Sequence, residues 1–226
     1  MNISKNIKIG VDMGLLDKYL LSGNAGDQSD QIERGVQILR HHPTYSHNSK
    51  KKGICMAMVC QWFLELNDHA DPVVMARRIL HDNLGPHGFG MLTTSQEFYG
   101  SQTGNDFGHV RWGIDDRMFR SHTGGMLQLN QQWGNIGNDQ QLRNRILAIS
   151  GLSRMLYIRF DGSLFWGLCP WAHAIGAYRD NNNIFYIFDP NYGIFRFPSV
   201  IQANIRFFSE LWNAYSPTSA IVYQIR

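Results

Sequence analysis

The chain has few cysteines, little charge and no long apolar run. Only three cysteines occur in 226 residues, and a small, odd number argues against a disulfide framework and favours a reducing compartment or a reactive thiol. No stretch approaches the run of about 18 apolar residues that a membrane span requires, and the N-terminus lacks the apolar core of a secretory signal. Export of this protein would therefore need a route that does not read such a signal.

Charged residues make up 17% of the chain and leave a net charge of +3. The only compact basic run is 50–52, which is too little for a nucleic-acid-binding surface, so we predict no nucleic-acid partner. The remaining composition, 43% hydrophobic and 12% aromatic, is that of a globular protein large enough to bury a core. We expect a monomer.

The chain divides into a polar front segment, 1–50, which we expect to be an extension packed on the core, and a core domain, 51–226. In the core domain, helical periodicity predicts several helices, and the apolar stripe of the first one starts at Cys55. Later segments rich in β-branched and aromatic residues predict strands. The order of helices followed by strands indicates an α+β fold with an antiparallel sheet. The predicted helices are 13–21 and 28–40 in the front segment and 54–66, 72–81, 139–150 and 199–212 in the core domain. The predicted strands are 155–160, 172–178, 184–188, 194–197 and 220–225.

Residues 85–137 contain eleven glycines and little periodicity. Glycine favours turns and disfavours the interior of helices and strands. We therefore interpret this segment as long loops interrupted by short elements.

Cys55 lies at the first turn of the predicted helix 54–66. A helix N-terminus stabilises a thiolate by about 0.3 to 1 kcal/mol, and its unpaired N–H groups can stabilise an oxyanion. The alternative is a small buried hydrophobic residue, which is the commoner role of a cysteine on an apolar helix face. We assign that structural role to Cys60, which lies five residues further round the helix, and to Cys169.

His173 and Asp189 lie on two predicted strands joined by an Asp-Asn-Asn-Asn turn at 180–183. If Arg179 pairs with Asn183 across a three-residue loop, His173 falls directly opposite Asp189, and a four-residue loop places His173 opposite Pro190. An acid beside a histidine holds the ring tautomer and favours the imidazolium that a thiolate partner requires. The alternative is a structural histidine and a strand-ending Asp-Pro turn.

The other histidines that we considered as metal ligands have irregular spacing, and none forms a His-x-x-x-His pair. We therefore predict no metal and no other cofactor. These histidines are His69, His81, His87, His109 and His122.

Three sequence blocks resemble the YopT and AvrPphB family of papain-like cysteine proteases, which bacteria inject into host cells. The blocks are 53–58 with Trp62, then 173–178, then 188–195, in the family's order of Cys, His and Asp. The resemblance implies a papain-like fold, with a helical lobe carrying Cys55 packed on an antiparallel sheet carrying His173 and Asp189. It also implies peptide cleavage through an acyl-enzyme on Cys55, with His173 as general base and Asp189 orienting the histidine.

The same resemblance implies secretion by injection, as in type III secretion, and action in the host cytoplasm on a host signalling protein, including membrane-proximal substrates. The family's second oxyanion donor is an Asn or Gln side chain a few residues before the cysteine. In this chain Asn48 fits that role by chemistry, although its offset of seven residues is long, and Ser49 is the other candidate.

Two alternative functions fit the same residues. A deamidase or transglutaminase-like toxin would use the same triad on glutamine side chains. A papain-like binding module would keep the fold without turnover.

Overall fold

The computed structural model describes most of the core domain in five stretches, and the predicted front segment 1–50, with its Asn48 and Ser49, lies outside them. The described residues are 55–67, 70–80, 111–151, 154–164 and 169–226. The helices are α4 (Cys55–Asn67), α5 (Pro72–Leu80), α7 (Arg111–His122), α8 (Asp139–Ser150) and α9 (Val200–Tyr215). The strands are β1 (Leu129–Ile136), β2 (Met155–Leu164), β3 (Cys169–Arg179), β4 (Phe185–Asp189), β5 (Gly193–Phe197) and β6 (Ser219–Ile225).

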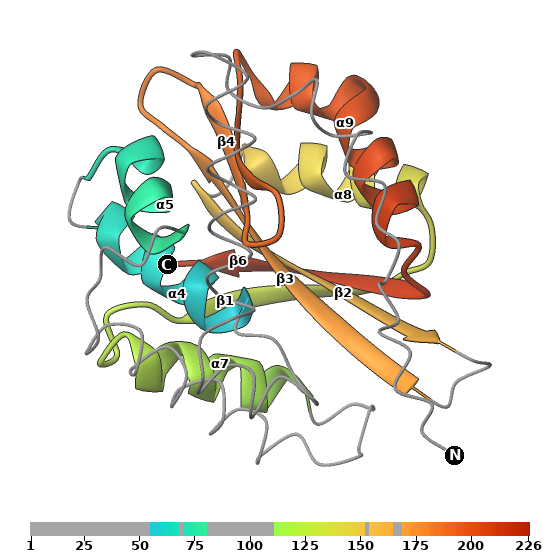
Figure 1. The fold of residues 1–226 in the computed structure, drawn as a ribbon, viewed down its shortest axis with the longest axis horizontal. Coiled ribbons are helices and arrows are strands. Elements are labelled where there is room, and N and C mark those ends of the chain that lie inside the picture. The colour runs from blue at the N-terminus through green and yellow to red at the C-terminus, as the bar shows by residue number, and fades with distance from the viewer. Residues whose placement is uncertain (1–54, 68–69, 81–110, 152–153, 165–168) are drawn as a thin grey trace, which may run out of the picture.

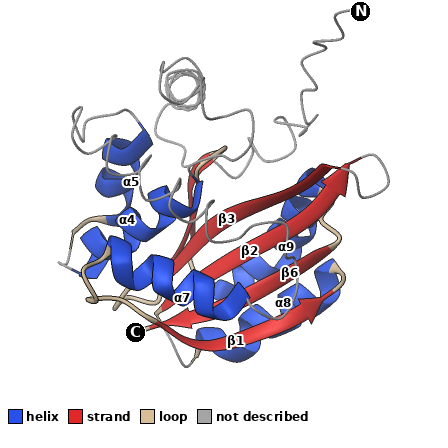
Figure 2. Ribbon diagram, turned by 90° about the horizontal axis from the view of Figure 1, so that it is seen from below, coloured by secondary structure: helices blue, strands red, loops and turns tan. Residues whose placement is uncertain are grey.

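The strands form one sheet in the order β1-β6-β2-β3-β4-β5, and every neighbouring pair is antiparallel. Helices α4 and α7 lie on one face of this sheet, and α8 and α9 lie on the other (Figures 1 and 2). The α+β architecture with a helical front and an antiparallel sheet is thus the one that the sequence predicts. None of the described helices combines the length and apolar character needed to cross a bilayer.

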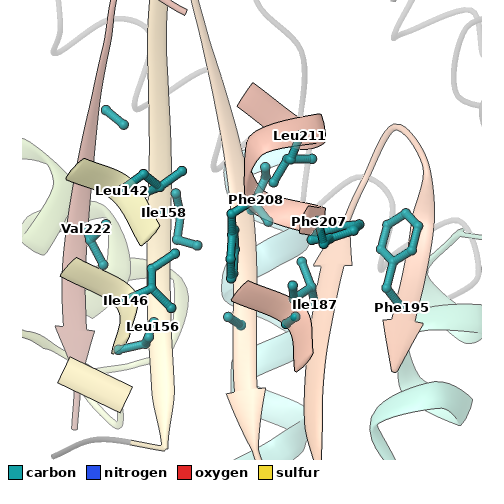
Figure 3. Packing of buried hydrophobic residues seen from close by; sticks show 14 of the residues in the cluster. Leu142, Ile146, Leu156, Ile158, Ile187, Phe195, Phe207, Phe208, Leu211 and Val222 are labelled. Carbon is teal, nitrogen blue, oxygen red and sulfur yellow. The ribbon is translucent and has the colours of Figure 1, made fainter. Parts of the chain in front are cut away.

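Two hydrophobic clusters, one on each face of the sheet, hold these layers together. The first joins α4 to β3 and includes the fully buried Trp62 and Phe63. The second joins α8 and α9 to the opposite face (Figure 3), and its labelled members are Leu142, Ile146, Leu156, Ile158, Ile187, Phe195, Phe207, Phe208, Leu211 and Val222.

Helix α4 is buried on more than the single stripe that the sequence predicts. Besides the predicted face, Met56, Ala57 and Cys60 are also buried, because α5 and α7 pack beside α4 while β3 lies beneath it. A helix covered on several sides tolerates few polar residues, which accounts for the run from Cys55 to Cys60. Cys60 is fully buried in the core, as its structural assignment requires.

Side-chain caps fix the starts of the helices around this core. The Asp71 carboxylate accepts hydrogen bonds from the backbone N–H groups of Val73 (2.8 Å) and Val74 (2.9 Å) at the start of α5. Asn138 caps α8 and Ser199 caps α9 in the same way. Each cap satisfies a helix donor that would otherwise lack a partner.

The hairpin of β3 and β4 has a register that differs from both sequence-based expectations. Its three-residue loop is 181–183 rather than 180–182, because Asp180 pairs with Ile184 through a backbone hydrogen bond of 3.0 Å. The Asp180 carboxylate also accepts from the N–H of Asn182 and of Ile184, and Asn183 adopts the left-handed conformation with φ 64°.

This shift moves every cross-strand partner by two residues, so that Gly176 pairs with Phe188. Continued along the strands, the register places Ile175, not His173, opposite Asp189. A shift of two keeps each side chain on its original face, whereas a shift of one would reverse it. His173 and Asp189 are therefore diagonal neighbours on the same face of the sheet.

The expectation of long loops at 85–137 is wrong for its second half. Helix α7 and strand β1 both fall within it. The strand contains Asn, Gln and Gly, and it forms by pairing along β6 with two register irregularities. Such a strand depends on its neighbour and not on its own sequence pattern.

Candidate active site

Cys55 is the first residue of α4, and its side chain is partly exposed. The apolar residues that follow it anchor the helix on β3, so the sulfur is held at the positive end of the helix dipole. This is the position that the sequence predicts for Cys55.

His173 and Asp189 are in direct contact on the sheet. The Nε2 atom of His173 lies 2.9 Å from Oδ1 of Asp189, and the two residues are 6% and 0% exposed. The same Oδ1 accepts a hydrogen bond of 2.8 Å from the backbone N–H of Asn191. The diagonal offset between the two residues is thus bridged by their side chains.

At His173, strand β3 is paired with a neighbouring strand on one side only. Strand β3 pairs with β2 at Phe160↔His173, but its pairing with β4 ends at Gly176↔Phe188. Beyond that point one edge of β3 is available to the N-terminus of α4. Cys55 makes a hydrogen bond there with the backbone of Ala174, next to His173.

Cys55 also forms a hydrogen bond with the side chain of His173. Because Nε2 of His173 faces Asp189, the other ring nitrogen, Nδ1, is the one that remains for the sulfur. Cys55, His173 and Asp189 therefore form one continuous chain of contacts drawn from α4, β3 and β4.

The electrostatics of this chain favour transfer of the thiol proton to the imidazole. Burial and the charge of Asp189 raise the pKa of Cys55. The hydrogen bond and charge of His173 and the hydrogen bond with the Ala174 backbone lower it by more, so this pKa lies below its ordinary 9.0. Burial lowers the pKa of His173, but the charge and hydrogen bond of Asp189, reinforced by Cys55, raise it to about 10. Both shifts favour the thiolate and imidazolium over the neutral pair.

Tyr215 is a site residue that the sequence analysis missed. It is the last residue of α9, beyond the predicted end of that helix at 212. Its hydroxyl lies 2.9 Å from Oδ1 and 2.8 Å from Oδ2 of Asp189, and 2.9 Å from Nε2 of His173. Its ring stacks on the imidazole of His173, with centroids 4.6 Å apart.

A signal for Tyr215 existed, although it was incomplete. The apolar stripe of α9 runs through Phe207, Phe208 and Leu211, and a further helical turn places Tyr215 on the same buried face. That spacing predicts burial but does not reveal that the hydroxyl reaches Asp189.

The other sequence-based candidates are placed only in part. Cys169 begins β3, and its side chain lies outside the described residues, as do Asn48, Ser49 and four of the five histidines considered as ligands. The fifth is His122, whose Nε2 lies 3.1 Å from Oε1 of Gln61. Burial lowers the pKa of His122. The described residues contain no group of three His, Cys, Asp or Glu side chains that could hold a metal ion.

Comparison with known proteins supports the same fold and family. The model of the peptidase family described as "Yersinia/Haemophilus virulence surface antigen" matches residues 126–221, which include His173 and Asp189 but not Cys55. The crystal structure of the Pseudomonas avirulence protein AvrPphB is similar, with a TM-score of 0.56 and 16% sequence identity over 82% of this chain and 95% of that one. A search among curated proteins found no match.

These findings confirm the resemblance to the YopT and AvrPphB family. They also confirm the expected fold, a papain-like α+β architecture with helices packed on an antiparallel sheet.

Proposed function

We propose that this chain is a cysteine protease in which Cys55 is the nucleophile, His173 the general base and acid, and Asp189 the residue that orients the histidine. The observation that carries the proposal is the hydrogen-bonded chain from Cys55 through His173 to Asp189. Helix α4 supplies the thiol, and the β3–β4 hairpin, distant from it in sequence, supplies the imidazole and the carboxylate. The family match and the similarity to AvrPphB support the same reaction class.

The reaction follows from this geometry. The Cys55 thiolate attacks the carbonyl carbon of a peptide bond, and the N-terminal N–H groups of α4 stabilise the oxyanion that forms. The His173 imidazolium then gives its proton to the leaving amine, and an acyl-enzyme on Cys55 results. Water, deprotonated by the now neutral His173, hydrolyses the acyl-enzyme, and the Cys55 thiolate and His173 imidazolium are regenerated.

Asp189 supports both proton transfers. A carboxylate accepts hydrogen bonds and does not donate them, so its contact with Nε2 fixes the tautomer in which that nitrogen carries the proton. The same contact stabilises the imidazolium that is present before the first transfer and forms again in the second. Asn48 or Ser49 would supply the second oxyanion donor.

The substrate that we propose is a host protein with a signalling role, cleaved in the host cytoplasm after injection by a bacterium. The description of the matched family as a virulence antigen and the avirulence role in the name of AvrPphB support this setting. We propose that the protein acts as a monomer, and we include membrane-proximal proteins among its substrates.

The proposal is tested by incubating host-cell lysate with the wild-type protein and with single variants, followed by mass spectrometry of peptide termini. We expect new termini with the wild type, none with Cys55→Ala, and a loss of about 10²- to 10⁴-fold with Asp189→Asn. Cys60→Ala is the matched control, because Cys60 lies on the same helix but is buried in the core.

The same experiment separates the alternative functions. A shift of about one dalton on glutamine side chains, without new termini, would identify a deamidase. A lysate unchanged by the wild type, with Cys55 labelled by iodoacetamide no faster than Cys60, would favour a binding module. Cleavage by Cys55→Ala at the wild-type rate would refute the mechanism.

A further inference from the structure

We infer that Tyr215 is a positioning residue for the site, acting on Cys55 through the Asp189–His173 pair, and this inference rests on the roles proposed above for those residues. Its hydroxyl holds the carboxylate of Asp189 in place, and its ring holds the imidazole of His173.

The direction of each hydrogen bond at the Tyr215 hydroxyl follows from its partners. The Nδ2 group of Asn191 lies 3.1 Å from the hydroxyl, and an amide NH₂ only donates, so the phenol oxygen accepts that bond. The single hydroxyl proton is then free for Asp189, whose two oxygens lie at 2.8 and 2.9 Å. The hydroxyl thus fixes the carboxylate, whose Oδ1 also contacts Nε2 of His173 at 2.9 Å.

The ring of Tyr215 performs a second task. It stacks on the imidazole at an interplanar angle of 22°, and Phe160 and Tyr192 pack against its other sides. Tyr215 is only 6% exposed, so water is kept from one face of His173. Electrostatic interactions among the enclosed groups are consequently stronger than they would be in water.

The end of α9 holds Tyr215 at this position. Ser216 closes the helix in the left-handed conformation, with φ 47°, and its backbone N–H donates to the carbonyl of Trp212 at 2.7 Å. The chain turns away immediately after the tyrosine. The backbone of Tyr215 therefore has little freedom to shift relative to the sheet.

The effect on Cys55 passes through His173. The hydrogen bond and charge of His173 lower the pKa of Cys55, so any displacement of the imidazole should raise it. The titratable groups that interact within this cluster are Cys55, His173, Asp189, Tyr192 and Tyr215. Burial and the charge of Asp189 raise the pKa of Tyr215 well above its ordinary value, so its hydroxyl keeps the proton that it donates.

The test measures the rate of Cys55 alkylation by iodoacetamide against pH in the full chain, with the adduct located by mass spectrometry. In Tyr215→Phe, which keeps the ring and loses the hydroxyl, we expect the pH midpoint to rise by about one unit, the scale of one hydrogen bond to a charged group. At any pH below the wild-type midpoint the rate should fall about tenfold, because the thiolate fraction there falls about tenfold for each unit.

Two comparisons isolate the cause. Tyr223→Phe is the matched control, because Tyr223 is fully buried but packs on Tyr157 in the cluster on the other face of the sheet, and its midpoint should not move. In an Asp189→Asn background, adding Tyr215→Phe should change the rate by less than about twofold, since the hydroxyl acts through Asp189.

A wild-type midpoint in a folded Tyr215→Phe protein, with only its melting temperature lowered, would overturn the inference and leave Tyr215 a structural role. If Tyr215→Phe does not fold, Asn191→Ala is tested in its place, because Asn191 is exposed and its amide donates to the Tyr215 hydroxyl. We expect this variant to raise the pH midpoint of Cys55 alkylation, and an unchanged midpoint would refute the inference. Alkylation requires no peptide substrate, so a dependence on Tyr215 without proteolysis would overturn only the proposed function.

Discussion

Gly176→Ala should separate the helix that carries the thiol from the strand that carries the imidazole. A Cβ atom at position 176 would lie 2.8 and 2.9 Å from two ring carbons of Trp62 and 3.1 Å from the ring of Phe63. Trp62 cannot easily move away, because it is fully buried and its Nε1 donates a hydrogen bond of 3.0 Å to the carbonyl of Pro72. The added methyl group must therefore push α4 away from β3.

Overpacking of this kind costs about 1 to 3 kcal/mol. In a protein of this size that loss lowers the melting temperature by about 2 to 4 °C for each kcal/mol. Cys55 lies seven residues before Trp62, about 10 Å along the helix, and a misplacement of about 1 Å at a reacting group can reduce rates about 10²-fold. We expect both a lower melting temperature and a 10- to 100-fold slower alkylation of Cys55.

The matched control is Gly151→Ala at the end of α8. A Cβ atom there meets nothing within 4 Å, and the φ of −74° suits any residue, so stability should stay the same or rise by up to about 1 kcal/mol. Trp62→Phe replaces the indole with a smaller ring, so the loss of stability caused by Gly176→Ala should be smaller in the double variant than in the single one. A Gly176→Ala protein with the melting temperature and Cys55 reactivity of the wild type would refute this account of the α4–β3 contact.

Two further predictions concern pH and helix capping. The pKa of His173 rises from 6.5 to about 10 on folding, so the stability that this charge contributes is complete below pH 6.5 and is lost as the pH rises through about 10. Urea titrations should therefore show a larger fall in unfolding free energy for the wild type than for His173→Gln over that interval, and parallel curves would contradict the assignment. Asp71→Ala removes the cap that accepts from Val73 and Val74 and should cost about 1 kcal/mol in urea denaturation without changing Cys55 alkylation; an unchanged midpoint of unfolding would argue against the cap.

The elements that the sequence predicts well are those whose own pattern decides their structure. Helix α8 occupies the predicted residues 139–150, because its apolar spacing lies within the segment and its Asn138 cap immediately precedes it. Strand β1 was missed because its stability comes from pairing with β6, which is distant in sequence.

The candidate site shows the same division. The resemblance and the hairpin turn brought His173 and Asp189 to the same face, but the register depended on which residue pair closes the loop, and the Asp180 side chain decides that locally. Tyr215 could not be connected to Asp189 from sequence, because their contact exists only once α9 has docked on the sheet.

The four interacting groups come from two layers of the fold, so the reactivity of the Cys55 sulfur reports whether these layers are still packed together. His173, Asp189 and Tyr215 all belong to the sheet and the helix packed behind it, while Cys55 alone arrives on α4 from the opposite layer. Regions of a protein can open separately at free energies below that of global unfolding. If fast alkylation of Cys55 is lost at a lower denaturant concentration than the circular dichroism of the sheet, helix α4 separates from the sheet before the protein unfolds.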